Sequence, residues 1–339
     1  MGRTALADAF GRPISWARVR ATRAGTDPPR KHSDLANGTP RVHPAACRGT
    51  ASPECARHPH DARPLRRRPS RQVRSLNSGD NVLMFEHELQ LAVEAALKAG
   101  GEVARLRREG VRYGRKDGWE LVSEADIRAA EILHEALTRA FPSDGWLSEE
   151  HDDTIERLGR ERVWIVDPID GTREYLQGIP EYAISVALVA EGQPVLGVVH
   201  NPATGELFAA GCAATQERLP TEPTGHPIEV LVGRGEQLHD ELPPLPSGTE
   251  TRGVGSVAYR LALLARGDGN AALSGYGRAE WDVAAGIALC RAAGLRASDI
   301  FGERMLFNQP EPYVRGLLVA EPGLHARLAG WFSQFRRPE

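Results

Sequence analysis

Apolar residues recur at helical spacing from residue 85 onward, and this pattern predicts two amphipathic helices. The first is predicted over residues 85–109, with an apolar face of Leu89, Val93, Ala96 and Leu97. After the turn-rich segment 109–120, the second is predicted in LVSEADIRAAEILHEALTRAF. Ser123 and Asp126 form a Ser-x-x-Asp arrangement at its start, which resembles a capping box with Asp in place of Glu. Asp126 is therefore first interpreted as a helix-start carboxylate that the helix dipole stabilises.

Strand-like runs dominate the middle of the chain, and helices and strands alternate after it. Strands are predicted at 163–167, 182–192 and 194–211, the last as a hairpin that turns at 201–205. After a connection rich in Pro, Gly and Glu at 217–250, we predict a helix at 257–267, a strand at 268–277 and an apolar helix from near Asp282. This mixed order favours a layered α/β or α+β fold, with two sheet-containing halves at 84–215 and 216–335.

The first 83 residues differ from the rest in charge and composition. They hold 16 Lys and Arg against 6 Asp and Glu, a net charge of +10, which leaves −13 for the rest of a chain whose total is −3. Nine prolines and a lack of helical or alternating periodicity predict a disordered basic extension. Three interpretations compete: a basic arm for nucleic acid, an Arg-rich transit peptide, or translation from a misplaced start upstream of Met84. We favour the misplaced start, with the basic arm second.

The composition as a whole indicates a soluble, globular, cytoplasmic protein. At 339 residues and 41% hydrophobic content, the chain can build the core of one large domain or two smaller ones. Its four cysteines lack C-x-x-C spacing, which argues against a disulfide framework or a zinc cluster and fits a reducing cytoplasm. The sequence contains no run of about 18 apolar residues, so no membrane association is expected.

Two aspartates end the buried apolar run of WIVDPIDGTREYLQG. An uncompensated buried charge is costly, so Asp167 and Asp170 have to be solvated, hydrogen-bonded or neutralised by a cation. The tight turn that Gly171 allows lets both carboxylates and the carbonyl of Ile169 converge, and such hard oxygen donors suit Mg²⁺. Gly171 and Thr172 then offer backbone N–H groups to a substrate phosphate. The alternative is an ordinary Asp-Pro and Asp-Gly turn.

Two further acidic motifs accompany this one. WLSEEHDD places Glu149 and Glu150 after an apolar pair, and EWDVAAG places Asp282 beside Trp281. In this order, SEE, DPIDGT and WDVAAG resemble the signatures of the inositol monophosphatase superfamily, a group of Mg²⁺-dependent, lithium-sensitive phosphomonoesterases, over residues 86–325. The resemblance implies the layered αβαβα sugar-phosphatase fold. It also implies a set of metal ligands: Glu149, Asp167, Asp170, Asp282 and the Ile169 carbonyl.

The resemblance further implies a mechanism. Two or three Mg²⁺ ions would neutralise the phosphate oxygens, lower the pKa of a bound water and stabilise the leaving alkoxide, so that hydroxide attacks in line. In the family a threonine of D-G-T and an aspartate of V-T-x-x-D orient or deprotonate that water, which implies catalytic roles for Thr172 and Asp126. Residues 122–126 match with Ser in place of Thr. Glu149 is a further candidate for the base, because it is a carboxylate beside the metals.

The flanks of these motifs bear on the substrate. The superfamily includes inositol monophosphatases, histidinol phosphatases, fructose bisphosphatases and phosphatases of 3′-phosphoadenosine 5′-phosphate (PAP), which share the metal core. Arg173 and Glu174 complete a D-G-T-R-E sequence that resembles bacterial PAP phosphatases, the 3′(2′),5′-bisphosphate nucleotidases. Where inositol enzymes supply a glutamate, six residues before the W-D tryptophan, this chain has Gly275. Arg173, Lys116 and Arg278 are candidates to pair with a second phosphate, although exposed arginines are commonly just solvated.

We therefore predict hydrolysis of a small phosphate ester, with PAP favoured and inositol 1-phosphate, histidinol phosphate or a sugar phosphate as alternatives. Because family members are often dimers, a homodimer is one expectation. The non-enzyme alternative is a nucleic-acid-binding protein. That role would rest on residues 1–83 alone, since the acidic remainder repels phosphate backbones.

Overall fold

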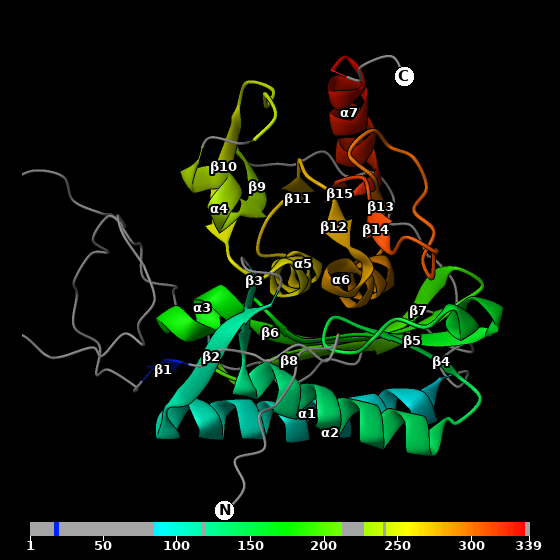
Figure 1. The fold of residues 1–339 in the computed structure, drawn as a ribbon. Helices are drawn as coiled ribbons and strands as arrows, with labels where there is room; N and C mark the ends of the chain where they lie inside the picture. The colour runs from blue at the N-terminus through cyan, green and yellow to red at the C-terminus, as the bar shows by residue number, and fades with distance from the viewer. Residues whose placement is uncertain (1–16, 20–84, 117–119, 212–226, 240–241, 336–339) are drawn as a thin grey trace, which may run out of the picture. The chain divides into compact units, whose positions relative to one another are not determined.

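The structure, a computed structural model, describes residues 17–19, 85–116, 120–211, 227–239 and 242–335. All of these residues belong to one compact unit. Within it, helices and sheets alternate in layers: a helix pair, a five-stranded sheet, a second helix pair, a second five-stranded sheet and a final helix (Figure 1). This order confirms the αβαβα arrangement expected from the motifs.

The first layer consists of α1 (Glu86–Glu109) and α2 (Glu124–Ala140), the two helices predicted from periodicity. The buried face of α1 carries mostly small side chains, namely Ala92, Ala95, Ala96, Ala99 and Val103. Leu97 was predicted on this face but is 45% exposed, because successive helical residues are rotated by about 100° and Ala96 takes the inward position. Ser123 is the N-cap of α2, as predicted.

The segment between these helices was predicted as turns and instead forms an antiparallel hairpin of β2 (Val111–Lys116) and β3 (Glu120–Ser123). Within residues 1–83 the structure describes only β1 (Ala17–Val19), which pairs antiparallel with β2. The rest of the predicted basic extension lies outside the described residues. The boundaries predicted at 83/84 and 215/216 stay predictions.

The first sheet has the strand order β4-β5-β6-β7-β8, with β4 parallel to β5 and the other neighbours antiparallel. Its strands are β4 (Gly145–Ser148), β5 (Arg162–Asp170), β6 (Ala183–Ala190), β7 (Gln193–Asn201) and β8 (Glu206–Gly211). The strands predicted between 163 and 211 are confirmed, and β4 is an addition. Trp164 and Val166 pack on the side of α1 and α2, whereas Val163 and Ile165 pack on the other side. The apolar run of β5 is thus continuous because both of its faces are buried.

The second helix pair, α5 (Val257–Arg266) and α6 (Glu280–Ala292), lies between the two sheets (Figure 1). The helix predicted from near Asp282 begins two residues earlier, at Glu280. The second sheet has the order β10-β9-β11-β15-β13. Its strands are β9 (Ile228–Gly233), β10 (Thr249–Val254), β11 (Ala271–Ser274), β13 (Arg296–Ser298) and β15 (Leu317–Ala320).

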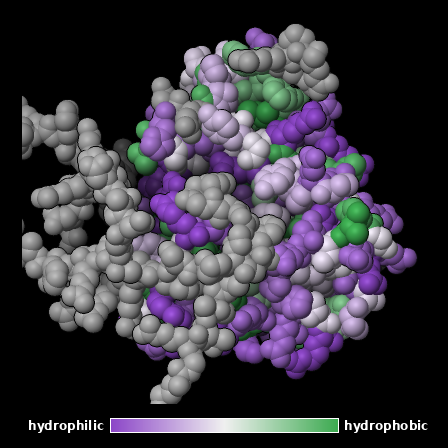
Figure 2. Space-filling model, in the orientation of Figure 1, coloured by the Kyte–Doolittle hydropathy of each residue, from purple (hydrophilic) through white to green (hydrophobic). Residues whose placement is uncertain are grey.

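The prediction of residues 217–250 as a connection is wrong in part, because this segment contains β9 and the short helix α4 (Arg234–Leu238). The run IEVLVG of β9 is almost wholly buried, and its Pro-rich surroundings concealed it from a pattern analysis. Helix α7 (Pro322–Ser333) covers the outer face of this sheet with Leu324, Leu328 and Phe332. Figure 2 shows hydrophobic surface over α7 on an otherwise largely hydrophilic face.

The remaining elements are short and position functional residues. They are the helix α3 (Thr172–Gln177), the 3-10 turn η1 (Ile155–Gly159) and the ribbon of β12 (Arg278–Ala279) with β14 (Tyr313–Val314). Among the described helices, none is both long and apolar enough to cross a bilayer.

Candidate active site

Strand β5 carries Asp167 and Asp170 at its end, where both are buried, with exposures of 2% and 8%. Asp167 is opposite Ser185 of β6 and Asp170 is opposite Ala183. Two residues of β5 therefore face a single residue of β6, which is a β-bulge. A bulge bends its strand and re-aims the side chains beside it. Because of this bulge, two carboxylates three positions apart reach the same end of the sheet.

The carboxylate of Asp170 is held by the start of α5. Its Oδ2 accepts hydrogen bonds from the Ser256 hydroxyl at 2.6 Å and from the Ala258 backbone N–H at 2.5 Å. Ser256 is also the N-cap of α5, where its Oγ accepts from the backbone N–H of Tyr259. The positive end of the helix dipole thus faces an acidic residue 86 positions earlier in the chain.

Thr172 joins the Asp126 carboxylate to the DPIDGT turn. Its hydroxyl lies 2.8 Å from Oδ1 of Asp126 and 3.2 Å from the carbonyl oxygen of Ile169, and it can donate to either. Oδ2 of Asp126 accepts from both the backbone N–H and the hydroxyl of Ser123, the capping box expected from the sequence. Asp126 is therefore a helix cap and a partner of Thr172 at once. The interpretation of Asp126 as a helix-start carboxylate is therefore compatible with its interpretation as a catalytic residue beside Thr172.

Glu149 reaches the site because β4 and β5 are parallel. Ser148, the last residue of β4, is opposite Val166, so Glu149 emerges level with Asp167. The Lys116 ammonium at the end of β2 contacts Glu149 at 2.9 Å and Glu150 at 2.7 Å. Lys116 is 7% exposed, which makes these ion pairs largely shielded from water.

Asp282 enters from the first turn of α6. The hydroxyl of Ser185 donates to the carbonyl of Trp281 at 3.0 Å and fixes this turn on β6. Ser185 is the residue opposite Asp167 in the sheet, so the helix start lies beside the end of β5. The three acidic motifs of the sequence therefore meet at one place.

Burial and mutual repulsion perturb these carboxylates. Burial raises the pKa of Asp126 and of Asp170 to about 6, against the hydrogen bonds that each accepts. Burial first, and then the charges of Glu149, Asp170 and Asp282, hold the pKa of Asp167 well above its usual range. The pKa of Asp282 is raised in the same way, by burial and by its acidic neighbours. Protonation or a cation therefore relieves an unfavourable concentration of negative charge.

The acidic cluster also shifts the pKa values of Lys116 and Glu150. Burial alone would lower the pKa of Lys116, but Glu149, Glu150 and Glu120 outweigh it and the pKa is raised. Burial, followed by the charge of Glu149, raises the pKa of Glu150 to about 8. One ammonium thus offsets only part of the acidic charge.

The donor set fits a hard divalent cation. All of its members offer oxygen, and closely spaced carboxylates that raise each other's pKa are stabilised by a positive ion. Within the described residues, no three Asp, Glu, His or Cys side chains lie close enough together to hold a metal ion. The predicted ligands are Glu149, Asp167, Asp170, Asp282 and the Ile169 carbonyl, and the structure gathers them in one region without placing them around one point.

The predicted substrate residues differ in their positions. Gly171, with φ 96°, is the N-cap of α3, which begins at Thr172 as expected. Arg278 of β12 lies close enough to lower the pKa of Asp170 and Asp282, and it pairs with Glu236 at 3.1 Å. Arg173 is exposed on α3, and no contact to another described residue places it in the site. The phosphate-binding roles of these residues stay predictions.

Sequence reasoning missed several residues that hold the site together. Ser256 secures Asp170, and Glu236 secures Arg278 while accepting from Ser274 and the Gly275 backbone N–H. Neither has a local signal in the sequence, because their partners lie tens of residues away. Lys116 was considered for a phosphate and instead neutralises Glu149 and Glu150. The burial of Lys116 comes from the folded β2–β3 hairpin, so no local signal in the sequence indicated these ion pairs.

The buried carboxylates, the threonine hydroxyl bonded to an aspartate and the layered α/β frame fit a metal-dependent phosphatase. The model of the Inositol monophosphatase family matches residues 84–334. This match covers well over half of the sequence, and the chain belongs to the inositol monophosphatase family, whose members are generally metal-dependent.

Individual relatives within the family differ in name. An inositol-1-monophosphatase of Mesorhizobium japonicum is 34% identical over 240 residues, which cover 65% of this chain and 88% of the relative. A 3′-phosphoadenosine 5′-phosphate phosphatase of Mycobacterium bovis is 31% identical over 241 residues, covering 68% and 88%. The crystal structure of CysQ from Bacteroides thetaiotaomicron superposes with a TM-score of 0.57 at 25% identity, covering 70% of this chain and 98% of that one. The comparisons thus agree on the family and diverge on the substrate.

Proposed function

We propose that this protein is a Mg²⁺-dependent 3′(2′),5′-bisphosphate nucleotidase that releases one phosphate from PAP in the cytoplasm. The proposal rests mainly on one observation. Asp167, Asp170 and Asp282 lie in one region, next to the hydrogen-bonded pair of Thr172 and Asp126. Inositol 1-phosphate is the second candidate substrate, favoured by the inositol-1-monophosphatase among the relatives.

Residues of this chain provide both the cation site and the handling of the proton. Glu149, Asp167, Asp170, Asp282 and the Ile169 carbonyl would hold two or three Mg²⁺. When bound, these ions neutralise phosphate oxygens and make the attacking water more acidic. Thr172 donates its hydroxyl proton to Oδ1 of Asp126, which leaves the Thr172 oxygen as an acceptor for that water. Both oxygens of Asp126 are hydrogen-bonded, so the carboxylate cannot rotate away and the water is held in one orientation.

The preference for PAP rests on Arg278 and Gly275. Arg278 keeps 24% of its side chain exposed beside two of the proposed metal ligands, and its guanidinium is suited to a second phosphate. Gly275 offers no carboxylate to the hydroxyls of a polyol. Its backbone N–H is instead bonded to Glu236, which in turn holds Arg278.

The test is Mg²⁺-dependent phosphate release by the full chain from PAP and from inositol 1-phosphate, with and without lithium. We expect kcat/KM for PAP to exceed that for inositol 1-phosphate by at least about ten-fold, since a charged hydrogen bond adds roughly 1.5–3 kcal/mol. The reverse preference would select the second candidate. No release from either ester would contradict the proposed function.

Two variants separate the parts of this proposal. Asp167→Asn is expected to abolish turnover, because it removes a negative charge from the cation site while keeping the side-chain volume. Asp299→Asn is the matched control, since Asp299 is also a buried carboxylate, with 8% exposure against 2% for Asp167, and it accepts from the backbone N–H groups of Phe301 and Glu303. Arg278→Gln should reduce kcat/KM for PAP more than for adenosine 3′-phosphate, which has one phosphate. Equal losses on the two esters would remove Arg278 from the substrate site.

A further inference from the structure

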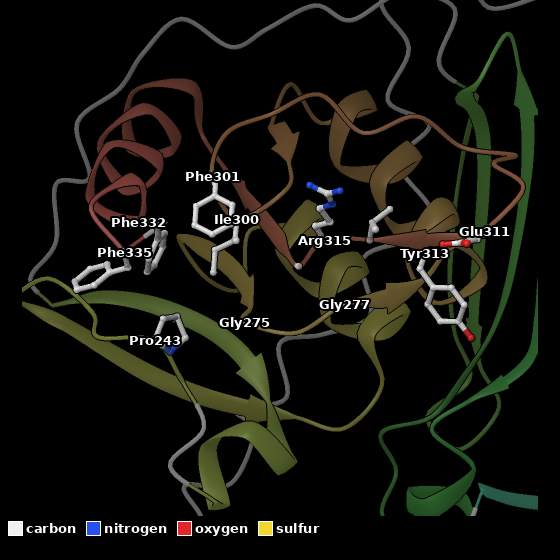
Figure 3. Close-up of a pocket in the computed structure, with 12 residues that line it drawn as sticks. Pro243, Gly275, Gly277, Ile300, Phe301, Glu311, Tyr313, Arg315, Phe332 and Phe335 are labelled. Carbon is white, nitrogen blue, oxygen red and sulfur yellow. The ribbon is translucent and has the colours of Figure 1, made fainter. Parts of the chain in front are cut away.

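A cavity of about 590 Å³ opens between the β12–β14 ribbon and α7 (Figure 3). Four aromatic residues line it, namely Tyr313 at one end and Phe301, Phe332 and Phe335 at the other (Figure 3). Gly275 and Gly277 form part of its wall and add no side chain to the space. The volume is in the range of pockets that bury a small organic ligand.

The Tyr313 end of this cavity adjoins the acidic site. Tyr313 is paired with Ala279, three residues before Asp282, and the Glu280 backbone N–H donates to the Pro312 carbonyl at 2.8 Å. The rings of Tyr313 and Trp281 meet edge to face, with centroids 6.2 Å apart. Burial, and then the charges of Glu120, Asp282 and Glu149, raise the pKa of Tyr313. The Tyr313 end of the cavity therefore lies next to the carboxylates that would hold the phosphate.

The lining has the chemistry of a site for flat rings. Tyr313 is 63% exposed and Phe335 is 46% exposed, so two large rings present apolar faces to solvent in a concave setting. A planar ring that stacks on such a face should gain binding free energy of the same order as a nucleic-acid base that stacks on an aromatic side chain. Glu311 beside Tyr313 supplies a hydrogen-bond acceptor for the polar edge of a heterocycle (Figure 3). A polyol would leave these aromatic faces wet.

We propose that this cavity binds the heteroaromatic ring of the substrate's leaving group, with Tyr313 as the stacking residue nearest the reacting phosphate. This inference rests on the proposed phosphatase function and names the class of ester that the site selects. Two sources supply such a ring, a nucleoside base or an imidazole. The size of the cavity favours the nucleoside base.

The kinetic test compares Tyr313→Ala with the wild type on three esters: adenosine 3′-phosphate, histidinol phosphate and the ring-free glycerol 2-phosphate. We expect kcat/KM for adenosine 3′-phosphate to fall at least about five-fold more than kcat/KM for glycerol 2-phosphate. Tyr313→Phe keeps the ring and should restore most of the loss. A selective loss on histidinol phosphate instead would assign the ring to an imidazole and overturn the nucleoside assignment.

Tyr276→Ala is the matched control. Tyr276 is 50% exposed, lies between the two glycines of the wall and does not line the cavity. It should affect the three esters equally and slightly. If Tyr313→Ala does the same as Tyr276→Ala, or lowers all three esters alike, the cavity does not bind the leaving group.

Binding of adenosine 5′-phosphate, the product of PAP hydrolysis, separates this inference from the proposed function. Calorimetric titration needs no turnover, and Tyr313→Ala should weaken the affinity at least about five-fold. Weakened binding in a protein that hydrolyses none of the esters would refute the proposed function and keep the ring site. Unchanged binding alongside active hydrolysis would refute the ring site alone.

Discussion

Replacing Asp170 by Asn should stabilise the protein when no divalent cation is bound. Asp170 is 8% exposed, and burial raises its pKa from the ordinary 3.8 to about 6. Asn keeps an oxygen that can accept from Ser256 and Ala258, so the hydrogen bonds at the start of α5 can persist. The substitution therefore removes the charge and little else.

The size of the effect follows from the pKa. Since one pKa unit corresponds to about 1.4 kcal/mol, the rise from 3.8 to about 6 is about 3 kcal/mol of lost stability. A carboxyl whose pKa is higher in the folded state costs nothing below its unfolded pKa, near 4, where both states are protonated. The cost builds up as the pH rises through about 6 and is complete above it. For a domain of this size, 3 kcal/mol moves the melting temperature by roughly 6 to 12 °C.

The assay is thermal unfolding of wild type and Asp170→Asn in EDTA at pH 7.5 and at pH 4, and then in Mg²⁺ at pH 7.5. We expect the variant to melt higher than the wild type in EDTA at pH 7.5 and to melt with it at pH 4. Mg²⁺ should raise the melting temperature of the wild type more than that of the variant, because it binds the ionised carboxylate.

Asp299→Asn serves as the control for this experiment. It removes an equally buried carboxylate away from the acidic cluster, and we expect it to be neutral or destabilising at pH 7.5, with an unaltered response to Mg²⁺. The reasoning is refuted if Asp170→Asn melts below the wild type in EDTA at pH 7.5, or if its advantage is the same at pH 4.

Three other outcomes are expected. Thr172→Val removes the hydroxyl that contacts Asp126 and should lower kcat at least about 100-fold, whereas Thr172→Ser should retain most activity; steady-state phosphate release measures both. Lys116→Met removes a cation with which Mg²⁺ competes at its carboxylate partners, so half-maximal activation should occur at several-fold lower Mg²⁺, while exposed Lys98→Met should leave the titration unchanged. Burial lowers the pKa of His325 to about 4. The buried neutral imidazole therefore costs no stability above about pH 6.5, and the free energy of unfolding falls by up to about 3 kcal/mol as the pH drops to 4. Urea unfolding of His325→Gln should show a shallower loss over that range, and an identical slope would contradict this assignment.

Much of the helical and strand content was predictable, because its signals are local. The spacing of apolar residues marks α1 and α2, and Ser123 marks the start of α2. The continuous apolar runs of β5 and β6 come from strands buried on both faces. Such a run can be recognised in the sequence without knowing which strands it pairs with. Turns that glycine and proline punctuate separate these elements.

Elements without such a signal were missed. The hairpin of β2 and β3 was predicted as turns, because its strands are short and β2 carries a glycine and three positive charges among its six residues. Strand β9 lies in a Pro-rich connection and owes its place to neighbours on both sides, β10 and β11. Leu97 was assigned to the core from spacing alone, and the contact of α1 with the first sheet selected the alanine face instead.

The sequence by itself determined which residue types carry the chemistry: the aspartates of DPIDGT, Glu149 before it and Asp282 after it, in the order typical of one family. Only the tertiary structure decided that they meet. The parallel pairing of β4 and β5 levels Glu149 with Asp167, and Ser185 ties the start of α6 to the same strand end. The physical reason is that a motif extends over only a few neighbouring residues. The burial of each carboxylate, the repulsion between the charges and the hydrogen bonds that orient the side chains all come from elements far away in the sequence that pack against the site.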